Sequence, residues 1–174
     1  MTHSEPRTES APANAPGYEP ASRSDPFSLL VAEHALLRQQ FARTFLALQR
    51  GDDPAIMRAA LSALAESLRL HQGREEAVLY PVCERLFDGE AGAASVLRED
   101  HTALARHLAA LMRTSGSAGR ISRLRLDALR NEADEHFGRE ERVLFPMTAA
   151  LLSGTESGDL ARRLRTVVPP HGEG

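Results

Sequence analysis

The sequence predicts an all-α protein: an antiparallel up-down-up-down four-helix bundle with a short C-terminal helix and a disordered N-terminal tail. Three observations predict this class. Four segments carry apolar residues at alternating steps of three and four, the spacing of a helix face that packs in a bundle. The connections between them are short and rich in Asp, Pro and Gly, as expected between antiparallel neighbours. No useful length alternates polar and apolar residues with period two, so no sheet is expected.

Length and composition place these helices in one domain. The chain has 174 residues, and we expect residues 25–168 to form the bundle and 169–174 a C-terminal tail. Residues 1–24 are rich in Pro, Ser, Ala and Glu, a composition that buries too little apolar surface to become ordered. The net charge of −3 gives no indication of a nucleic-acid partner. Since neither a membrane-spanning stretch nor a signal core is visible, the expected location is the cytoplasm.

The first helix is predicted to begin at Asp25 and to end at Gly51. Aspartate is a favoured N-cap, and Pro26 suits the first helical position. Glycine at the end supplies the left-handed conformation of a C-cap. The apolar face comprises Leu30, Leu37, Phe41, Phe45 and Leu48, and His34 lies within it.

The second helix is predicted to begin at Asp53 and Pro54, with the same cap followed by proline. Its inward face comprises Met57, Leu61, Leu64, Leu68, His71, Glu75, Val78 and Val82. Two ionisable residues thus lie in the middle of an apolar seam. Pro81 lacks a backbone donor, so it is expected to kink or end the helix nearby.

Two more long helices are predicted at about 91–114 and 120–146, followed by a short one at about 156–167. The seam of the third helix comprises Ala94, Leu97, His101, Leu104, Leu108 and Leu111. The seam of the fourth comprises Leu126, Leu129, Ala133, His136, Glu140, Val143 and Met147. Each of the four long helices therefore carries one histidine on its inward face.

The chain is an internal duplication. Residues 71–81 and 136–146 both read His-x-Gly-Arg-Glu-Glu-x-Val-Leu-aromatic-Pro. Each copy is preceded by an acidic residue next to a histidine, at His34 and at His101. Such internal repeats take priority over local propensity when a sequence is interpreted.

The spacing of the duplicated motif indicates a metal site. Residues four apart lie on one face of a helix, so His71 with Glu75, and His136 with Glu140, each present an imidazole and a carboxylate together. Histidine and glutamate pairs on facing helices build the dinuclear carboxylate sites of helix bundles. A single histidine in a seam is more often a core residue, but two buried carboxylates without counter-charges would be costly. No arginine occupies the seams, so a bound metal is the favoured explanation.

The donors favour iron, with manganese or zinc as alternatives. Carboxylates with imidazoles suit Fe, Mn or Zn, and no cluster of thiolates is present because Cys83 is the only cysteine. If both glutamates bridge two metals, each metal receives two histidine nitrogens and two carboxylate oxygens. A bridging oxo or hydroxo group would leave one open position on each metal, where O₂, peroxide or NO could bind.

Other polar residues are assigned ordinary roles. Glu76 and Glu141 are rotated by about 100° from the seam glutamates, so they face solvent or accept hydrogen bonds from histidine N–H groups. Tyr80 is expected to be a packing residue whose hydroxyl could reach the site. His107 is expected at the surface, and Cys83 is expected to be a small buried residue.

These motifs resemble those of the hemerythrin-like, or HHE cation-binding, family over residues 27 to about 150. The resemblance implies a four-helix bundle around a non-haem di-iron centre. The implied ligands are His34, His71, Glu75, His101, His136 and Glu140. The oxygen carriers of the family have a further histidine four residues after the one on the third helix, and here that position is Ala105. They usually end with an aspartate five residues after a histidine, whereas Glu140 lies four after His136.

The missing fifth histidine argues against simple O₂ carriage. The leading hypothesis is a di-iron protein that binds or senses O₂, NO or peroxide, with a protein partner that the sequence does not identify. One alternative is an enzyme that removes hydrogen peroxide. Another is repair of iron–sulfur clusters linked to NO, although relatives with that role carry a cysteine in an N-terminal segment and residues 1–24 have none. In a fourth hypothesis the metal only stabilises the bundle.

Overall fold

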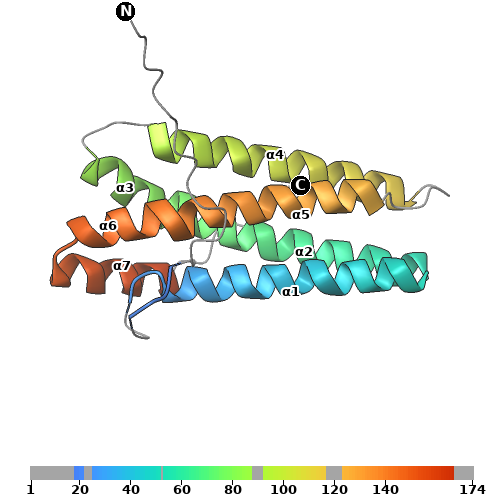
Figure 1. Cartoon of the computed structure of the whole chain (residues 1–174), viewed down its shortest axis with the longest axis horizontal. Coiled ribbons are helices and arrows are strands. Elements are labelled where there is room, and N and C mark those ends of the chain that lie inside the picture. The colour runs from blue at the N-terminus through green and yellow to red at the C-terminus, as the bar shows by residue number, and fades with distance from the viewer. Residues whose placement is uncertain (1–17, 22–24, 52, 88–91, 117–122, 167–174) are drawn as a thin grey trace, which may run out of the picture.

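Four long antiparallel helices form the bundle in the computed structural model (Figure 1). They are α1 (Ser28–Arg50), α2 (Pro54–Arg74), α4 (Gly92–Gly116) and α5 (Arg123–Arg139). Around the bundle α1 packs on α2, α2 on α4, α4 on α5, and α5 on α1. The structure describes residues 18–21, 25–51, 53–87, 92–116 and 123–166. Over these residues the predicted all-α bundle is confirmed.

The first helix begins two residues later than predicted, at Ser28 instead of Pro26, and ends where expected. α1 starts at Ser28, and Asp25 accepts a hydrogen bond from the backbone N–H of Phe27 at 2.9 Å in the turn before it. Gly51 ends the helix with φ at 69°, in the left-handed region that favours glycine. Within the predicted N-terminal tail residues 18–21 are described, and the Tyr18 hydroxyl donates to Asp25 at 2.8 Å. The rest of the predicted tails lies outside the described residues.

Of the two outcomes predicted near Pro81, a kink or an end, the helical structure does not end there but runs on from α2 to Leu86 with an irregular turn before the proline. Asp53 caps it as predicted, accepting from Ala55 N–H at 2.6 Å. A π-helical turn, η1 (Glu75–Leu79), then leads directly into α3 (Tyr80–Leu86). A π-turn bonds each N–H five residues back, here from Tyr80 to Glu75, which widens the helix just before proline. This wider turn accommodates the proline ring, which clashes with the carbonyl four residues earlier in a regular helix.

The fourth helix has the same interruption at the equivalent position. After α5 comes η2 (Glu140–Leu144), which leads into α6 (Phe145–Leu151). The sequence prediction of Val143 and Met147 as seam residues is wrong, because their side chains are 53% and 52% exposed. The additional residue in the π-turn rotates the following helix by about 100°, so Leu144 and Thr148 face inward instead.

The buried side chains form two apolar clusters. One lies between α1, α2, α4 and α5 and includes Phe41, Leu64 and Phe137. The other lies at the end of the bundle formed by η1, α3, η2 and α6. It is covered by α7 (Gly154–Thr166) through Leu160 and Leu164, close to the predicted short helix.

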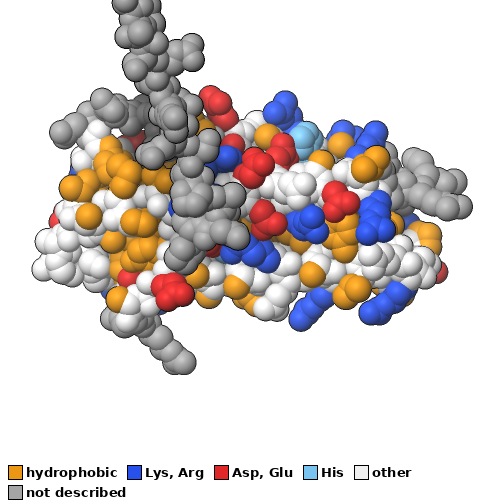
Figure 2. Space-filling model, in the orientation of Figure 1, with side chains coloured by type: hydrophobic (Ala, Val, Ile, Leu, Met, Phe, Trp, Pro, Cys, Tyr) orange, Lys and Arg blue, Asp and Glu red, His pale blue; other side chains and the backbone are white. Residues whose placement is uncertain are grey.

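The described surface carries both charged and hydrophobic side chains. Figure 2 shows charged side chains over the long helices and hydrophobic ones gathered toward the end formed by α3, α6 and α7. Val143, Met147 and Leu151 are among the exposed hydrophobic residues. Among the described helices, none combines the length and the apolar character needed to span a bilayer.

Candidate metal centre

The six predicted ligand residues meet in the interior of the bundle. His34 comes from α1, His71 from α2, His101 from α4 and His136 from α5, while Glu75 and Glu140 are the first residues of η1 and η2. Their side chains are at most 3% exposed. All six side chains are therefore brought together as the sequence predicts; their role as ligands stays a prediction.

The histidines form two pairs through their Nε2 atoms. His34 Nε2 lies 3.1 Å from His71 Nε2, and His101 Nε2 lies 3.1 Å from His136 Nε2. Each pair combines histidines from one copy of the duplicated motif. The two pairs are therefore two equivalent half-sites, the first from His34 and His71 and the second from His101 and His136.

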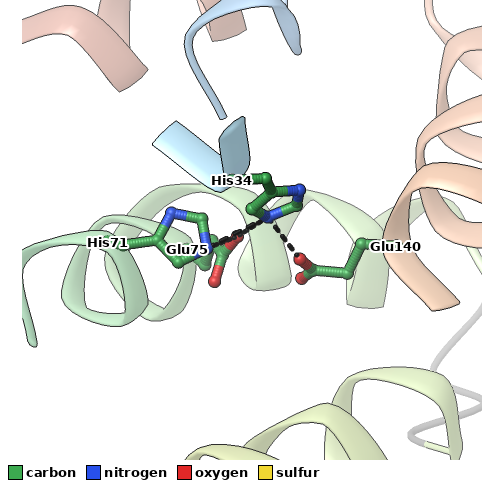
Figure 3. Close-up of side chains that lie close together, drawn as sticks. All are labelled: His34, His71, Glu75 and Glu140. Atoms are coloured by element: carbon green, nitrogen blue, oxygen red, sulfur yellow. Dashed lines mark hydrogen bonds and ion pairs between the residues drawn. The ribbon is translucent and has the colours of Figure 1, made fainter. Parts of the chain in front are cut away.

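The two glutamates lie between the half-sites. Glu75 Oε1 is 3.1 Å from His71 Nε2, and Glu75 Oε2 is 3.3 Å from His101 Nε2. Glu140 Oε2 is 3.3 Å from His34 Nε2 and 3.6 Å from His136 Nε2. Figure 3 shows Glu75 and Glu140 approaching His34 from two sides. Each carboxylate is thus placed to serve both half-sites.

Several carboxylate oxygens at this position lack a hydrogen-bond partner. Both oxygens of Glu75 and Oε2 of Glu140 are buried and accept no hydrogen bond. Burying a carboxylate without a compensating partner destabilises the folded protein by roughly several kcal/mol for each ion. The donor atoms form two groups, one at each half-site. Within each group the atoms lie within 4.8 Å of one another, and Glu75 belongs to both groups. These orphaned oxygens fit two cations, one at each half-site.

Every histidine is oriented by a carboxylate on its other nitrogen. The Nδ1 atoms of His34 and His101 each donate to a glutamate at 2.7 Å, and these acceptors are Glu141 and Glu76. The expected hydrogen bonds of the second motif glutamates are confirmed. Each reaches across to the histidine of the other copy. Since Nδ1 is engaged outward, Nε2 faces the centre, the arrangement usual for histidine ligands.

The remaining two histidines use acidic residues to which the sequence analysis assigned no role. His71 Nδ1 donates to Glu33 at 3.0 Å, and His136 Nδ1 contacts Asp100 at 3.3 Å. Glu33 and Asp100 directly precede the histidines of α1 and α4. The duplication of this acidic residue was visible in the sequence, and it is the signal that could have identified the pair.

Arginines hold three of these four outer carboxylates. Arg74 pairs with Glu33, and Arg139 pairs with Asp100 at 2.6 Å. Both arginines belong to the duplicated motif. Arg38 donates to Glu141 at 2.9 Å. Such support orients the carboxylates, so the imidazoles are held before any ion arrives.

The charges in the site alter its proton affinities. Burial disfavours the protonated form of His34, but the adjacent carboxylates of Glu140, Glu141 and Glu75 outweigh burial and raise its pKa to about 10. The same balance, with Glu75 and Glu76, raises the pKa of His101 to about 9. Burial opposes ionisation of Glu75, yet the neighbouring histidines lower its pKa well below the usual range. Protons thus provide the positive charge that an ion would otherwise supply.

Tyr80 distinguishes the two half-sites. Its side chain is completely buried, and its hydroxyl donates to Glu140 Oε1 at 3.1 Å and lies 3.1 Å from His101 Nε2. The equivalent residue in the second copy is Phe145, which stacks against Phe27 with a centroid distance of 4.7 Å. The sequence expectation that the Tyr80 hydroxyl could reach the site is therefore confirmed.

The other singled-out residues lie apart from the centre. His107 is exposed and pairs with Glu132 at 2.6 Å, as its surface prediction requires. Cys83 is buried, and its sulfur lies 3.4 Å from Thr148 Oγ1. The remaining two histidines of the chain, His3 and His171, fall outside the described residues.

Comparison with known families gives one result. The sequence model of the hemerythrin HHE cation binding domain matches residues 25–148 and, in a second overlapping match, residues 94–166. No curated protein and no solved structure gives a significant match. The first match spans all six residues of the centre, and the second begins near the start of α4, which carries His101.

Proposed function

Because the chain belongs to the hemerythrin HHE cation-binding family, we propose that its buried centre holds two non-haem iron ions and binds or senses O₂, NO or peroxide. His34 and His71 would hold one ion, and His101 and His136 the other. Glu75 and Glu140, which lie between the two histidine pairs, would provide the carboxylate donors. The observation that carries the proposal is the set of buried carboxylate oxygens without partners beside four inward-facing Nε2 atoms.

The donor set suits iron, and the proposed reaction with O₂, NO or peroxide requires a redox-active ion. Four imidazoles and two carboxylates suit iron, manganese or zinc, whereas the only cysteine, Cys83, is not among the donors. Iron supplies the ability to exchange electrons with a bound diatomic molecule or peroxide. Manganese or zinc in the centre would keep the fold but change this chemistry.

The protein's own residues orient the donors and exclude water. The outer carboxylates fix each histidine with Nε2 inward, and charge on Glu141 and Glu76 makes the imidazoles more basic. Apolar clusters on both sides enclose the centre, which strengthens electrostatic interactions within it. Tyr80 provides a hydroxyl donor to Glu140 inside this enclosure.

Metal analysis of anaerobically purified protein tests the proposal. We expect two irons per chain and a change of visible absorbance when O₂ or NO is admitted. Protein from iron-replete cells that contains neither iron nor another metal would contradict the proposal. Two irons with no spectral response to O₂, NO or peroxide would reduce the role of the metal to stabilising the bundle.

Removal of hydrogen peroxide is a second candidate function, supported by Tyr80. Disproportionation converts two molecules of H₂O₂ into two of water and one of O₂, so protons must move between oxygen atoms. The Tyr80 hydroxyl, 3.1 Å from both Glu140 and His101, is placed to hold or pass such a proton. Peroxide loss with O₂ evolution by the iron-loaded protein, reduced in Tyr80→Phe at equal iron content, would support this function.

A further inference from the structure

A groove of about 220 Å³ runs along the outside of the bundle between α2 and α4. Small and apolar side chains dominate its lining. These are Ala65, Leu68, Leu104, Ala105, Leu108, Ala109 and Met112, with Arg69 and Gln72 as the polar members. Leu68 and Leu104, which are 3% and 1% exposed, form the deep part of the lining.

The duplication allows this face to be compared with its counterpart between α1 and α5. There, two arginines lie over aromatic rings. The Arg38 guanidinium is 5.3 Å from the centroid of Phe137, and that of Arg130 is 5.0 Å from Phe45. Arg38 is also held by Asp134 at 3.2 Å. Long side chains thus cover the seam between α1 and α5.

All four covering residues are replaced in the other half of the duplication. Arg38 corresponds to Ala105, and Phe137 to Gln72, by the spacing of the equivalent histidines. Arg130 corresponds to Ala65, and Phe45 to Met112. These four residues all line the groove. The groove therefore exists because the covering pairs of one half have smaller, uncharged counterparts in the other.

The replacement of Phe137 by Gln72 at the equivalent position changes which side chains pack against the histidines of α1 and α4. His34 has Phe137 stacked on it at 4.2 Å, with Phe145 at 5.9 Å. His101 has Tyr80 at 5.5 Å, and the position equivalent to Phe137 is Gln72.

The groove lies beside the ligand histidines of α2 and α4. Its lining residue Gln72 directly follows His71, and Leu104 lies three residues after His101. Leu104 is one helical turn from His101, a rise of about 5 Å. Side chains such as Leu68 and Leu104 separate the groove from the centre, and side chains can move without breaking helical hydrogen bonds.

We propose that the groove between α2 and α4 is the path by which a small uncharged molecule, a diatomic gas or H₂O₂, reaches the half-site of His101 and His136. This inference rests on the proposed function and adds the route and the half-site. The apolar lining suits such molecules, whereas the arginine and phenylalanine pairs close the opposite face.

The test transfers the covering pair of the first half into the groove. The variant Gln72→Phe/Ala105→Arg is loaded with ferrous iron, and NO association and dissociation are followed by anaerobic stopped flow. An access path affects both directions equally, so both rates should fall by about tenfold or more, as an added barrier of about 1.4 kcal/mol would produce. The dissociation constant and iron content should stay unchanged.

A second covering pair and a surface control make the result specific. The variant Ala65→Arg/Met112→Phe should slow association and dissociation of NO in the same way. It replaces the first variant in the test if that variant does not fold. Ala63→Arg places the same charge on an exposed position of α2 outside the groove lining and should leave both rates unchanged. Unchanged NO rates in both groove variants at normal iron content would overturn the proposed path. Slower association of NO with a weaker affinity would also overturn it, because a path slows association and dissociation equally. Wild-type protein that contains iron but binds no NO, O₂ or peroxide would instead contradict the proposed function.

Discussion

Glu141 accepts a hydrogen bond from His34 Nδ1 at 2.7 Å, although the two residues are 107 positions apart. The equivalent residues of the other copy, Glu76 and His101, are joined at the same distance. Each copy of the motif therefore orients a histidine of the other copy. Each half-site therefore needs a glutamate from the other copy to orient one of its histidines.

This relationship predicts that Glu141→Gln weakens metal binding without removing a ligand. The neutral amide makes His34 less basic and holds its ring less firmly, so we expect a loss of about 10–100-fold in metal affinity. Competition with a chelator measures the affinity. Glu132→Gln, which alters the exposed pair with His107, is the matched control and should bind normally. Equal affinities in the two variants would show that the outer carboxylate has no influence on the ion.

Removal of two inner donors should make the melting temperature of the protein independent of metal binding. In wild-type protein a bound ion stabilises the folded state by about 4 kcal/mol at a thousandfold excess over its dissociation constant. We expect His71→Ala/Glu75→Ala to have a low iron content and a melting temperature that does not respond to a chelator. Calorimetry with and without chelator measures both proteins. A wild-type melting temperature that is also insensitive to chelator would mean that the site contributes little to folding.

Metal binding should release protons. With pKa values of about 10 and 9, His34 and His101 carry protons at neutral pH in the metal-free protein. An ion takes the Nε2 positions, so binding at pH 7 should release about two protons, and affinity should increase with pH. Titration calorimetry in buffers of different ionisation enthalpy counts the protons. Binding enthalpies that do not depend on the buffer would contradict this prediction.

The stability of the metal-free protein should decrease at high pH. The folded-state pKa values of His34 and His101 lie above the unfolded value of about 6.5. Their contribution is therefore complete below about pH 6.5 and is lost as pH rises through 9 to 10. Urea unfolding at pH 6.5 and pH 10, with chelator present, measures the difference. Greater stability at pH 10 would contradict the charge balance described for the centre.

The register of α6 is testable by a pair of neighbouring substitutions. Leu144 is 4% exposed and Val143 is 53% exposed. Leu144→Ala should cost about 2–5 kcal/mol through the lost packing and the remaining cavity. Val143→Ala should stay within about 0.5 kcal/mol, as for most surface positions. Denaturant unfolding compares the two variants. The reversed order would mean that the helix continues without a π-turn, as periodicity alone predicts.

Residue spacing along the chain was enough to predict the bundle and the assembly of the centre. The steps of three and four, the caps at Asp53 and Gly51, and the duplicated motif are local patterns. A helix converts such spacing directly into a shared face. For this reason His71 with Glu75, and His136 with Glu140, could be assigned to one interior point from residue numbers alone.

Tertiary structure alone decided the features that depend on contacts between helices. The π-turns appear where the chain must pass a proline and still bury Leu144, and one inserted residue is enough to expose Val143 and Met147. The pairing of Glu141 with His34 and the groove beside Gln72 also require packed neighbours. Periodicity describes one helix at a time, whereas these features follow from how side chains of separate helices fill a common space.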